Sequence, residues 1–150
     1  MDERLERDLS REGLVLTGGA RRIFAYTIDE ILISLIVLIA FWGDFSAQQD
    51  VRIIIETVNS FFWAVVGMKV LYQTLFVYLY GASLGKILTK CVIVAYDDFS
   101  RPTLQSAFIR AVVRIVSEMA FYIGFAWAFM NPARQTWHDK MAKTIVIDAY

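Results

Sequence analysis

The chain has 150 residues, the length of one ordinary domain, and its 15 Lys and Arg residues are balanced by 15 Asp and Glu residues. Hydrophobic residues make up 57% of the chain, which is more than one small soluble core can bury, so a membrane protein is expected. Zero net charge argues against a nucleic-acid partner, and a single histidine and a single cysteine argue against a metal site and an internal disulfide. No nucleophile stands beside a base, so the sequence indicates neither an enzyme nor a cofactor.

Residues 1–19 are expected to form a charged segment outside the membrane domain, which would comprise residues 20–150. Acids and bases alternate over 1–12, with Leu5 and Leu9 four positions apart, which predicts a short solvated or interfacial helix. The stretch GLVLTGG at 13–19 predicts a flexible joint.

Two apolar runs have the length of membrane-spanning helices. Residues 24–42 and 61–80 each supply about 20 residues, enough for a helix to cross a hydrocarbon core of about 30 Å. Aromatic residues crowd both ends of the second run, as they do at membrane interfaces. Residues 43–60 are expected to form a polar loop, with a short helix over 51–58.

A third helix is expected over residues 104–130. Arg110, Arg114 and Glu118 recur every four residues, which predicts an amphipathic helix on the inner membrane surface with its arginines at lipid phosphates. The uncharged second half is short for a crossing, and Asn131-Pro132 ends the helix. A full third span and a re-entrant or steeply tilted helix both stay open.

Two β-branched runs, CVIVAYDD at 91–98 and KTIVIDAY at 143–150, have matching lengths and are expected to pair as short strands. Such a pair needs helices to pack on it, and it requires both runs to lie on one side of the membrane. The expected fold is therefore an all-α membrane protein: a two-span hairpin, a third, partly amphipathic helix and a short β-pair.

Basic residues are spread unevenly around the two spans. Five precede the first span, one lies in the 43–60 loop, and five lie between residues 81 and 114. Because inner loops are rich in Lys and Arg, the N-terminus and the 81–114 region are expected inside and the 43–60 loop outside.

Three stretches, in order, resemble the RDD family, which is named for an arginine and two aspartates. RRIFAYTIDEILI resembles the family's opening, GASLGKILTKCVIV its glycine-rich turn and strand, and NPARQTWHDKMAKTIVI its closing block. The signature residues that match are Arg22, Asp29 and Asp139. The other matching positions are Gly81, Ser83, Gly85, Lys86, Arg134, Gln135, Thr136, His138 and Lys140.

The resemblance implies a multi-pass protein of a bacterial inner membrane. Some members of the family are described as cation/proton antiporters, and others are thought to serve as anchors or accessory subunits. Two intramembrane charges, Glu30 and Lys69, are not part of the family signature.

The polar residues inside the spans suggest an ion or proton site built on Asp29, Glu30, Lys69 and Gln73. Asp29 is either such a site or a charge clamp with Arg22 or a basic residue of another segment. Lys69 lies too deep to reach water easily, so it is expected to pair with Asp29 or Glu30.

The motif residues outside the spans favour structural roles. GASLGK has the wrong spacing for a phosphate loop, so Gly81 is expected to end the second helix and Ser83 to cap the next. His138 and Asp139 are a poor ligand set for a metal, so Asp139 is expected to cap a helix or pair with an arginine.

Two function classes remain. One is cation/proton exchange, which needs an oligomer because two or three spans enclose no pathway. The other is a non-catalytic anchor or accessory subunit of a larger membrane complex. The expected partners are the lipid bilayer and either further copies of the chain or other membrane proteins.

Overall fold

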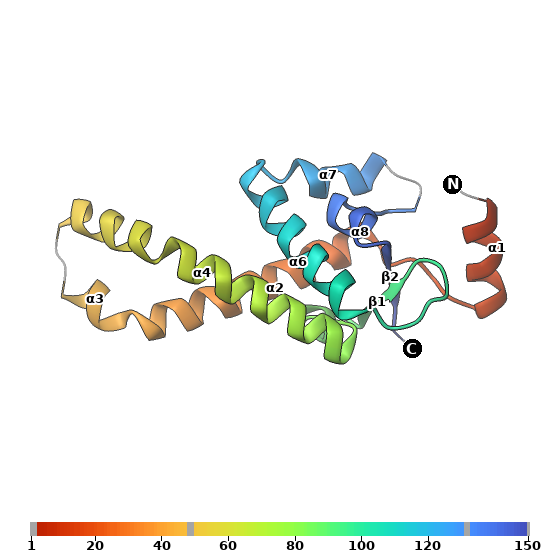
Figure 1. Ribbon diagram of the computed structural model, residues 1–150, viewed down its shortest axis with the longest axis horizontal. Helices are drawn as coiled ribbons and strands as arrows, with labels where there is room; N and C mark the ends of the chain where they lie inside the picture. The colour runs from red at the N-terminus through yellow and green to blue at the C-terminus, as the bar shows by residue number, and fades with distance from the viewer. Residues whose placement is uncertain (1–2, 48–49, 131–132, 150) are drawn as a thin grey trace.

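The structure, a computed structural model, describes residues 3–47, 50–130 and 133–149. Figure 1 shows a long helical hairpin from α2 to α4, with the other elements gathered at its open end. In chain order the elements are α1 (Glu3–Glu12), α2 (Gly19–Ala40), α3 (Trp42–Ser46), α4 (Val51–Tyr80), α5 (Leu84–Leu88), β1 (Cys91–Ala95), α6 (Leu104–Met119), α7 (Ile123–Met130), α8 (Trp137–Met141) and β2 (Thr144–Asp148).

The two long helices α2 and α4 contain the apolar runs predicted to span the membrane, and both are long and apolar enough to do so. The expected helical membrane fold is thus confirmed. The expected polar loop over 43–60 is wrong, because α4 begins at Val51. The short helix expected over 51–58 is confirmed as the first part of α4. The side chain of Asp50 accepts a hydrogen bond from the amide of Arg52 at 2.9 Å, which caps the helix, and no Pro interrupts the run that follows.

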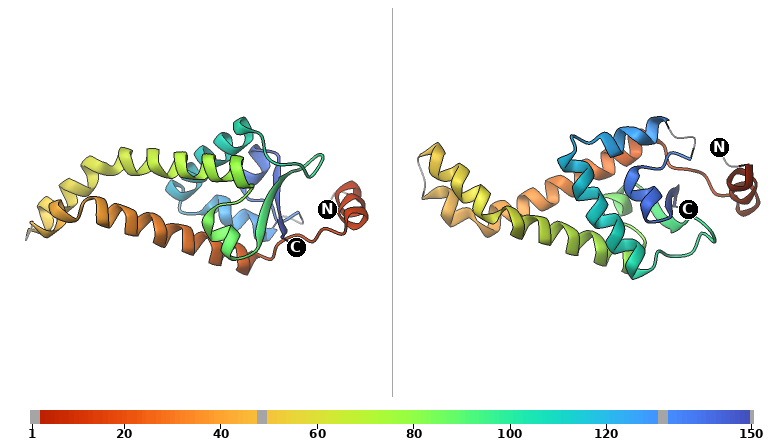
Figure 2. Two further views of the ribbon diagram at one scale, coloured as in Figure 1. Left: turned by 90° about the horizontal axis from the view of Figure 1, so that it is seen from below. Right: turned by 45° about the horizontal axis from the view of Figure 1, so that its top comes forward.

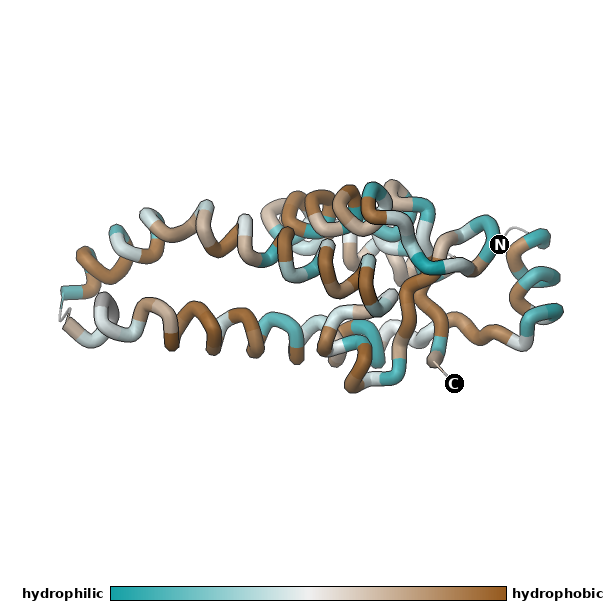
Figure 3. Tube along the Cα trace, turned by 60° about the horizontal axis from the view of Figure 1, so that its bottom comes forward, coloured by the Kyte–Doolittle hydropathy of each residue, from teal (hydrophilic) through white to brown (hydrophobic). Residues whose placement is uncertain are grey.

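The hairpin is braced at its base rather than along its length. α2 packs mainly on α5, and α4 packs mainly on α6 (Figure 2). Near the tip, the rings of Phe41 and Phe61 meet with their centroids 3.9 Å apart. Figure 3 shows hydrophobic residues along most of α2, and hydrophilic ones on α1 and around the base. The apolar faces between base and tip are therefore left for lipid or for another protein.

The expected strand pair is confirmed. β1 and β2 are antiparallel, with Ile93 opposite Val146 and Val94 opposite Ile145. Ile93, Ile145 and Val146 are buried, because α4 and α6 pack on one face of the pair and α1 on the other. The pair thus has the helical support that a two-stranded sheet requires.

The segment expected to be a flexible joint is instead paired with β2. The amide of Thr17 donates to the carbonyl of Val146 at 3.1 Å, and the amide of Asp148 donates to the carbonyl of Val15 at 2.9 Å. Leu16 forms a bridge with Ile147, so this segment covers an edge that β2 would otherwise expose. The interpretation of 13–19 as a joint is wrong for residues 15–17, because their backbone bonds to β2 hold them in place.

The predicted N-terminal helix exists as α1, and it docks on the sheet. Leu5 and Leu9 are buried against Val94, Ile145 and Ile147. Their four-residue spacing puts both on one face of the helix, as predicted. The polar face of α1 is left exposed.

The third helix is broken into α6 and α7, which are bent by 104°. Phe121 and Tyr122 adopt left-handed backbone conformations at the break, with φ of 53° and 61°. Since β1 precedes α6 and β2 follows α7, the pairing of the strands brings both arms back to the same end of the molecule. Both ends of the third segment therefore lie at the sheet end of the molecule, which favours a re-entrant segment over a simple third crossing. The Asn131-Pro132 stop lies outside the described residues.

The polar face of α6 points inward, against prediction. Arg110 and Arg114 are only 4% and 5% exposed, whereas Phe108, Val112 and Val116 on the other face are exposed. The partners of these two arginines are carboxylates of the fold, Asp139 for Arg110 and Glu30 and Glu118 for Arg114, rather than phosphates at the membrane surface. The periodicity was read as a helix with its charges outward, but a helix in lipid buries its charges against protein.

We predict that an impermeant thiol reagent, applied to intact cells of a Cys91→Ser variant, labels a cysteine at Ala47 but none at Arg4, Asp98 or Lys140. These four positions are exposed, and the last three lie at the sheet end of the molecule, where basic residues predict the cytoplasmic side. Cell lysis should make all four reactive. Labelling of Asp98→Cys in intact cells would contradict this orientation.

Candidate functional site

Asp29 is fully buried in α2, and its carboxylate is occupied by hydrogen-bond donors from the second span and the turn after it. It accepts bonds from the hydroxyl of Tyr72 at 2.8 Å, the hydroxyl of Ser83 at 2.6 Å and the amide of Gly85 at 2.8 Å. Arg114 approaches to 3.9 Å. The carboxylate therefore fastens α2 to the start of α5. The expected charge clamp forms with Arg114 of another segment and not with Arg22.

The GASLGK turn is built around this carboxylate. Gly81 ends α4 in a left-handed conformation with φ of 68°, as predicted. Ser83 occupies the position before α5, but its hydroxyl makes no cap and instead donates to Asp29. The predicted capping role of Ser83 is therefore wrong, because the carboxylate of Asp29 reaches the first turn of α5 from another helix.

We predict that Gly85→Ala destabilises the protein by about 1–3 kcal/mol, the usual range for overpacking. A Cβ at this position would lie 3.0 Å from Cγ of Asp29 and would collide with the carbonyl oxygen of Ala25. The measurement is thermal unfolding in detergent. Gly67→Ala is the control, since nothing lies within 4 Å of a Cβ there. Equal midpoints for the two variants would contradict the prediction.

A second group of charges includes Glu30, the residue that follows Asp29 in α2. The ammonium of Lys69 lies 2.7 Å from Oε2 of Glu30 and 3.1 Å from Oε2 of Glu118. Arg114 pairs with the other oxygen of each carboxylate. Its Nη2 lies 3.4 Å from Oε1 of Glu30, and its Nε lies 3.2 Å from Oε1 of Glu118. Each carboxylate thus presents one oxygen to each cation, and the four ionised groups sum to zero charge. We call these four residues the Lys69 cluster.

The outcome for the predicted ion site is mixed. The expected pairing of Lys69 is confirmed for Glu30, whereas Asp29 makes a separate set of bonds. Gln73 is buried, but its Nε2 has no hydrogen-bond partner among the described residues, so it does not join the cluster. Sequence reasoning had placed Arg114 at the membrane surface, and nothing in the sequence marked Tyr72.

A third group surrounds Asp139, the last residue of the signature. Its carboxylate pairs with Arg110 through Oδ1 and with Arg22 through Oδ2 at 3.0 Å. It also accepts from the amide of Thr136 at 3.1 Å, while its own amide donates to the hydroxyl of Thr136, forming a capping box at α8. The predicted capping and arginine-pairing role of Asp139 is confirmed.

The other residues of the closing block support this arrangement. The carbonyl of Arg134 accepts a bond from Arg22 at 2.5 Å, and the amide of Gln135 donates to the carbonyl of Thr144 at 3.0 Å. His138 is buried beside Asp139, whereas Lys140 is exposed. The block therefore ties α8 and β2 to the start of α2.

Burial and charge shift the pKa values of Lys86, His138 and Asp139, which lie outside the spans. Burial lowers the pKa of Lys86 to about 7, and the nearby Arg114 and Arg110 add to the effect. Burial also lowers the pKa of His138 well below its usual range. The guanidinium groups of Arg110 and Arg22 outweigh burial at Asp139 and lower the pKa of its carboxyl.

We predict that thermal stability rises between pH 7 and pH 10. In this window Lys86 is largely neutral in the folded protein but charged in the unfolded chain. Because the unfolded chain binds more protons, the free energy of unfolding increases as the pH rises. Melting temperatures across this range are the measurement. Lys86→Met should flatten the rise, whereas the exposed control Lys140→Met should keep it. A rise of the same slope in Lys86→Met would contradict the assignment.

Comparison with known proteins agrees with these motifs. The RDD family model matches residues 16–143, which is most of the chain and contains all three signature residues. No curated protein and no solved structure matches the chain. In the fold, Arg22 and Asp139 bond to each other, and Asp29 organises the glycine-rich turn. The chain therefore belongs to the RDD family.

Proposed function

We propose that the protein exchanges a monovalent cation for a proton, with Lys69 as the group that gives up the proton. The observation that carries the proposal is the position of its ammonium between Oε2 of Glu30 and Oε2 of Glu118. Arg114 neutralises one of the two carboxylate charges, so one negative charge is left for a single cation. In one state the protonated lysine balances that negative charge. In the other state the lysine is neutral and a bound cation balances it. One proton leaves as one cation enters, so the exchange is electroneutral.

The surroundings of Glu30 suit entry of an ion. Its side chain is 26% exposed and lines a groove of about 470 Å3 together with Tyr26, Ser34 and Tyr122. Among the described residues no three His, Cys, Asp or Glu side chains converge. Two carboxylate oxygens suit a weakly held monovalent ion better than a resident divalent metal.

An oligomer is part of the proposal. Two spans enclose no pathway, and the groove beside Glu30 opens along α2. A second copy against the apolar faces of α2 and α4 would close it. We place the protein in a bacterial inner membrane because of its family, and we place its N-terminus in the cytoplasm because of the distribution of its basic residues.

The test is proton movement in reconstituted vesicles that contain a pH-sensitive dye. Addition of Na⁺, K⁺ or Li⁺ to wild-type vesicles should drive proton release, and Lys69→Met should abolish it. Glu30→Gln should reduce the rate at least tenfold, whereas Glu56→Gln, an exposed carboxylate near the hairpin tip, should not. Wild-type vesicles without cation-dependent proton movement at several pH values would overturn the proposal.

A non-catalytic accessory subunit is the second candidate, and Asp29 favours it. Three donors within 2.8 Å hold this carboxylate, so the acidic residue of the family signature offers little to a cation. Native mass analysis after mild detergent extraction tests this alternative. A stoichiometric partner protein combined with absent flux would support it over exchange.

A further inference from the structure

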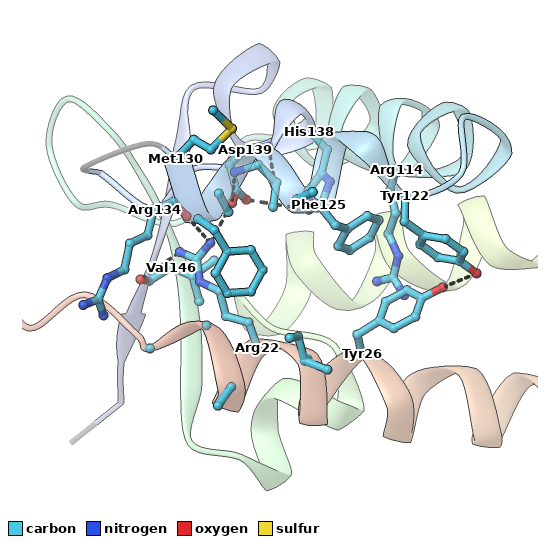
Figure 4. A pocket seen from close by; sticks show the side chains of 18 of the residues that line it. Arg22, Tyr26, Arg114, Tyr122, Phe125, Met130, Arg134, His138, Asp139 and Val146 are labelled. Carbon is cyan, nitrogen blue, oxygen red and sulfur yellow. Dashed lines mark hydrogen bonds and ion pairs between the residues drawn. The ribbon is translucent and has the colours of Figure 1, made fainter.

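A cavity of about 990 Å3 lies between the start of α2, the bend from α6 to α7, and α8 (Figure 4). Its described lining contains one acidic residue, Asp139. The basic residues of the lining are Arg22, Lys86, Arg110, Arg114, Arg134 and His138. Basic side chains thus outnumber acidic ones in this lining, and the cavity meets the groove beside Glu30 at Tyr26 and Tyr122.

Three buried polar groups of this lining lack the partners that burial normally demands. Nε of Arg22 and Nδ1 of His138 have no hydrogen-bond partner among the described residues. The ammonium of Lys86 reaches only the hydroxyl of Ser83, at 3.5 Å, and has no carboxylate within 4 Å in the described part of the chain. Burial without a nearby carboxylate disfavours the protonated form of Lys86, and an anion in the cavity would favour that form again.

The other walls of the cavity are apolar. Ile23 of α2 faces Phe125 and Phe129 of α7, with Phe121 at the bend. Figure 4 shows Arg22 and Asp139 at one side and the aromatic rings of Tyr26, Tyr122 and Phe125 at the other. Phe121 and Phe129 are largely exposed, so the apolar walls continue onto the surface.

The position of the cavity matches a membrane boundary. It adjoins Gly19, where α2 and its candidate span begin, and Phe129 lies beside that residue. Lipid phosphates lie at this depth, with acyl chains alongside the span. A soluble anion would use the basic groups but would leave the aromatic walls without an occupant.

We propose that the cavity binds an anionic phospholipid, with its phosphate directed at Arg22, Lys86 and His138 and its acyl chains leaving between α2 and α7. The basic groups supply charge-assisted hydrogen bonds to the phosphate oxygens. The aromatic and aliphatic walls cover the first part of the chains. This site goes beyond cation exchange, because its phosphate ligands Arg22, Lys86 and His138 are not members of the Lys69 cluster, although the two sites meet at Tyr26, Arg114 and Tyr122.

The test uses the full chain, delipidated in an uncharged detergent, with melting temperature as the readout. Short-chain phosphatidylglycerol should raise the melting temperature up to a plateau as its concentration increases. Phosphatidylcholine of the same chain length should not raise it. Lys86→Met should weaken the apparent affinity for phosphatidylglycerol at least tenfold, as loss of one charged hydrogen bond does. Lys140→Met, an exposed lysine outside the cavity, should match wild type.

A second variant covers the case in which Lys86→Met does not fold. Phe129→Ala removes a side chain that is 70% exposed, so it should leave the fold intact and weaken lipid binding severalfold. Inorganic phosphate is the third ligand. Equal shifts with both lipids, phosphate binding as tight as phosphatidylglycerol binding, or unchanged lipid affinity in Phe129→Ala would each overturn the proposal.

Discussion

Asp139→Asn is expected to lower the free energy of unfolding by about 3–5 kcal/mol, the usual loss when one partner of a buried ion pair is removed. The carboxylate is fully buried and holds Arg22 and Arg110 together with the cap of α8. An amide in its place leaves two guanidinium groups without a counter-charge. Denaturant titration in mixed micelles is the measurement.

Two comparisons make this expectation specific. Asp98→Asn changes an exposed carboxylate in the turn after β1, and it should stay within about 0.5 kcal/mol of wild type. Arg110→Met combined with Asp139→Asn should lose less than the sum of the two single variants. A loss under about 1 kcal/mol for Asp139→Asn alone would show that this pair does not hold the fold together.

The second large effect concerns Lys69. Lys69→Met leaves Glu30 and Glu118 facing each other with Arg114 as the remaining cation, and a loss of about 3 kcal/mol is expected. Lys69→Met with Glu30→Gln restores the charge balance of the cluster and should recover much of that stability. Thermal unfolding of the single and double variants in detergent completes the cycle.

This cycle also separates stability from transport. The double variant should fold well but exchange no proton, because the lysine that releases it is gone. Strictly additive losses would show that Lys69 and Glu30 do not interact. If the double variant is stable and still exchanges protons, a group other than Lys69 releases the proton.

Much of the architecture follows from local sequence patterns. The apolar runs predict α2 and the second half of α4, and the β-branched runs around Ile93 and Val146 predict the strand pair. A lysine as deep in its span as Lys69 requires a carboxylate partner, and the sequence offers few inside the spans. Pairing with Glu30 could therefore be predicted. In each case the determining feature lies within one segment or follows from a charge that lipid cannot accommodate.

The parts that were not predicted depend on contacts between distant segments. The four-residue spacing of Arg110 and Arg114 defines a face of α6, but spacing alone does not say whether that face meets lipid or protein. Asp29 is 54 residues from Ser83 and 56 from Gly85, so its bonds with them appear only in the folded chain. The pairing of residues 15–17 with β2 escaped prediction because three residues are too few to show strand periodicity.

The bond between Arg22 and Asp139 has a consequence for biosynthesis. The two residues are 117 positions apart, and a ribosome adding about 5–20 residues per second needs roughly 6–23 s to make the intervening chain. Both long helices are synthesised before Asp139, so the hairpin enters the membrane with Arg22 still lacking this carboxylate. Closure of the base is therefore a late, post-insertion step, and a nascent chain that stops before the closing block exposes an unsatisfied arginine and an open strand edge to quality-control proteases.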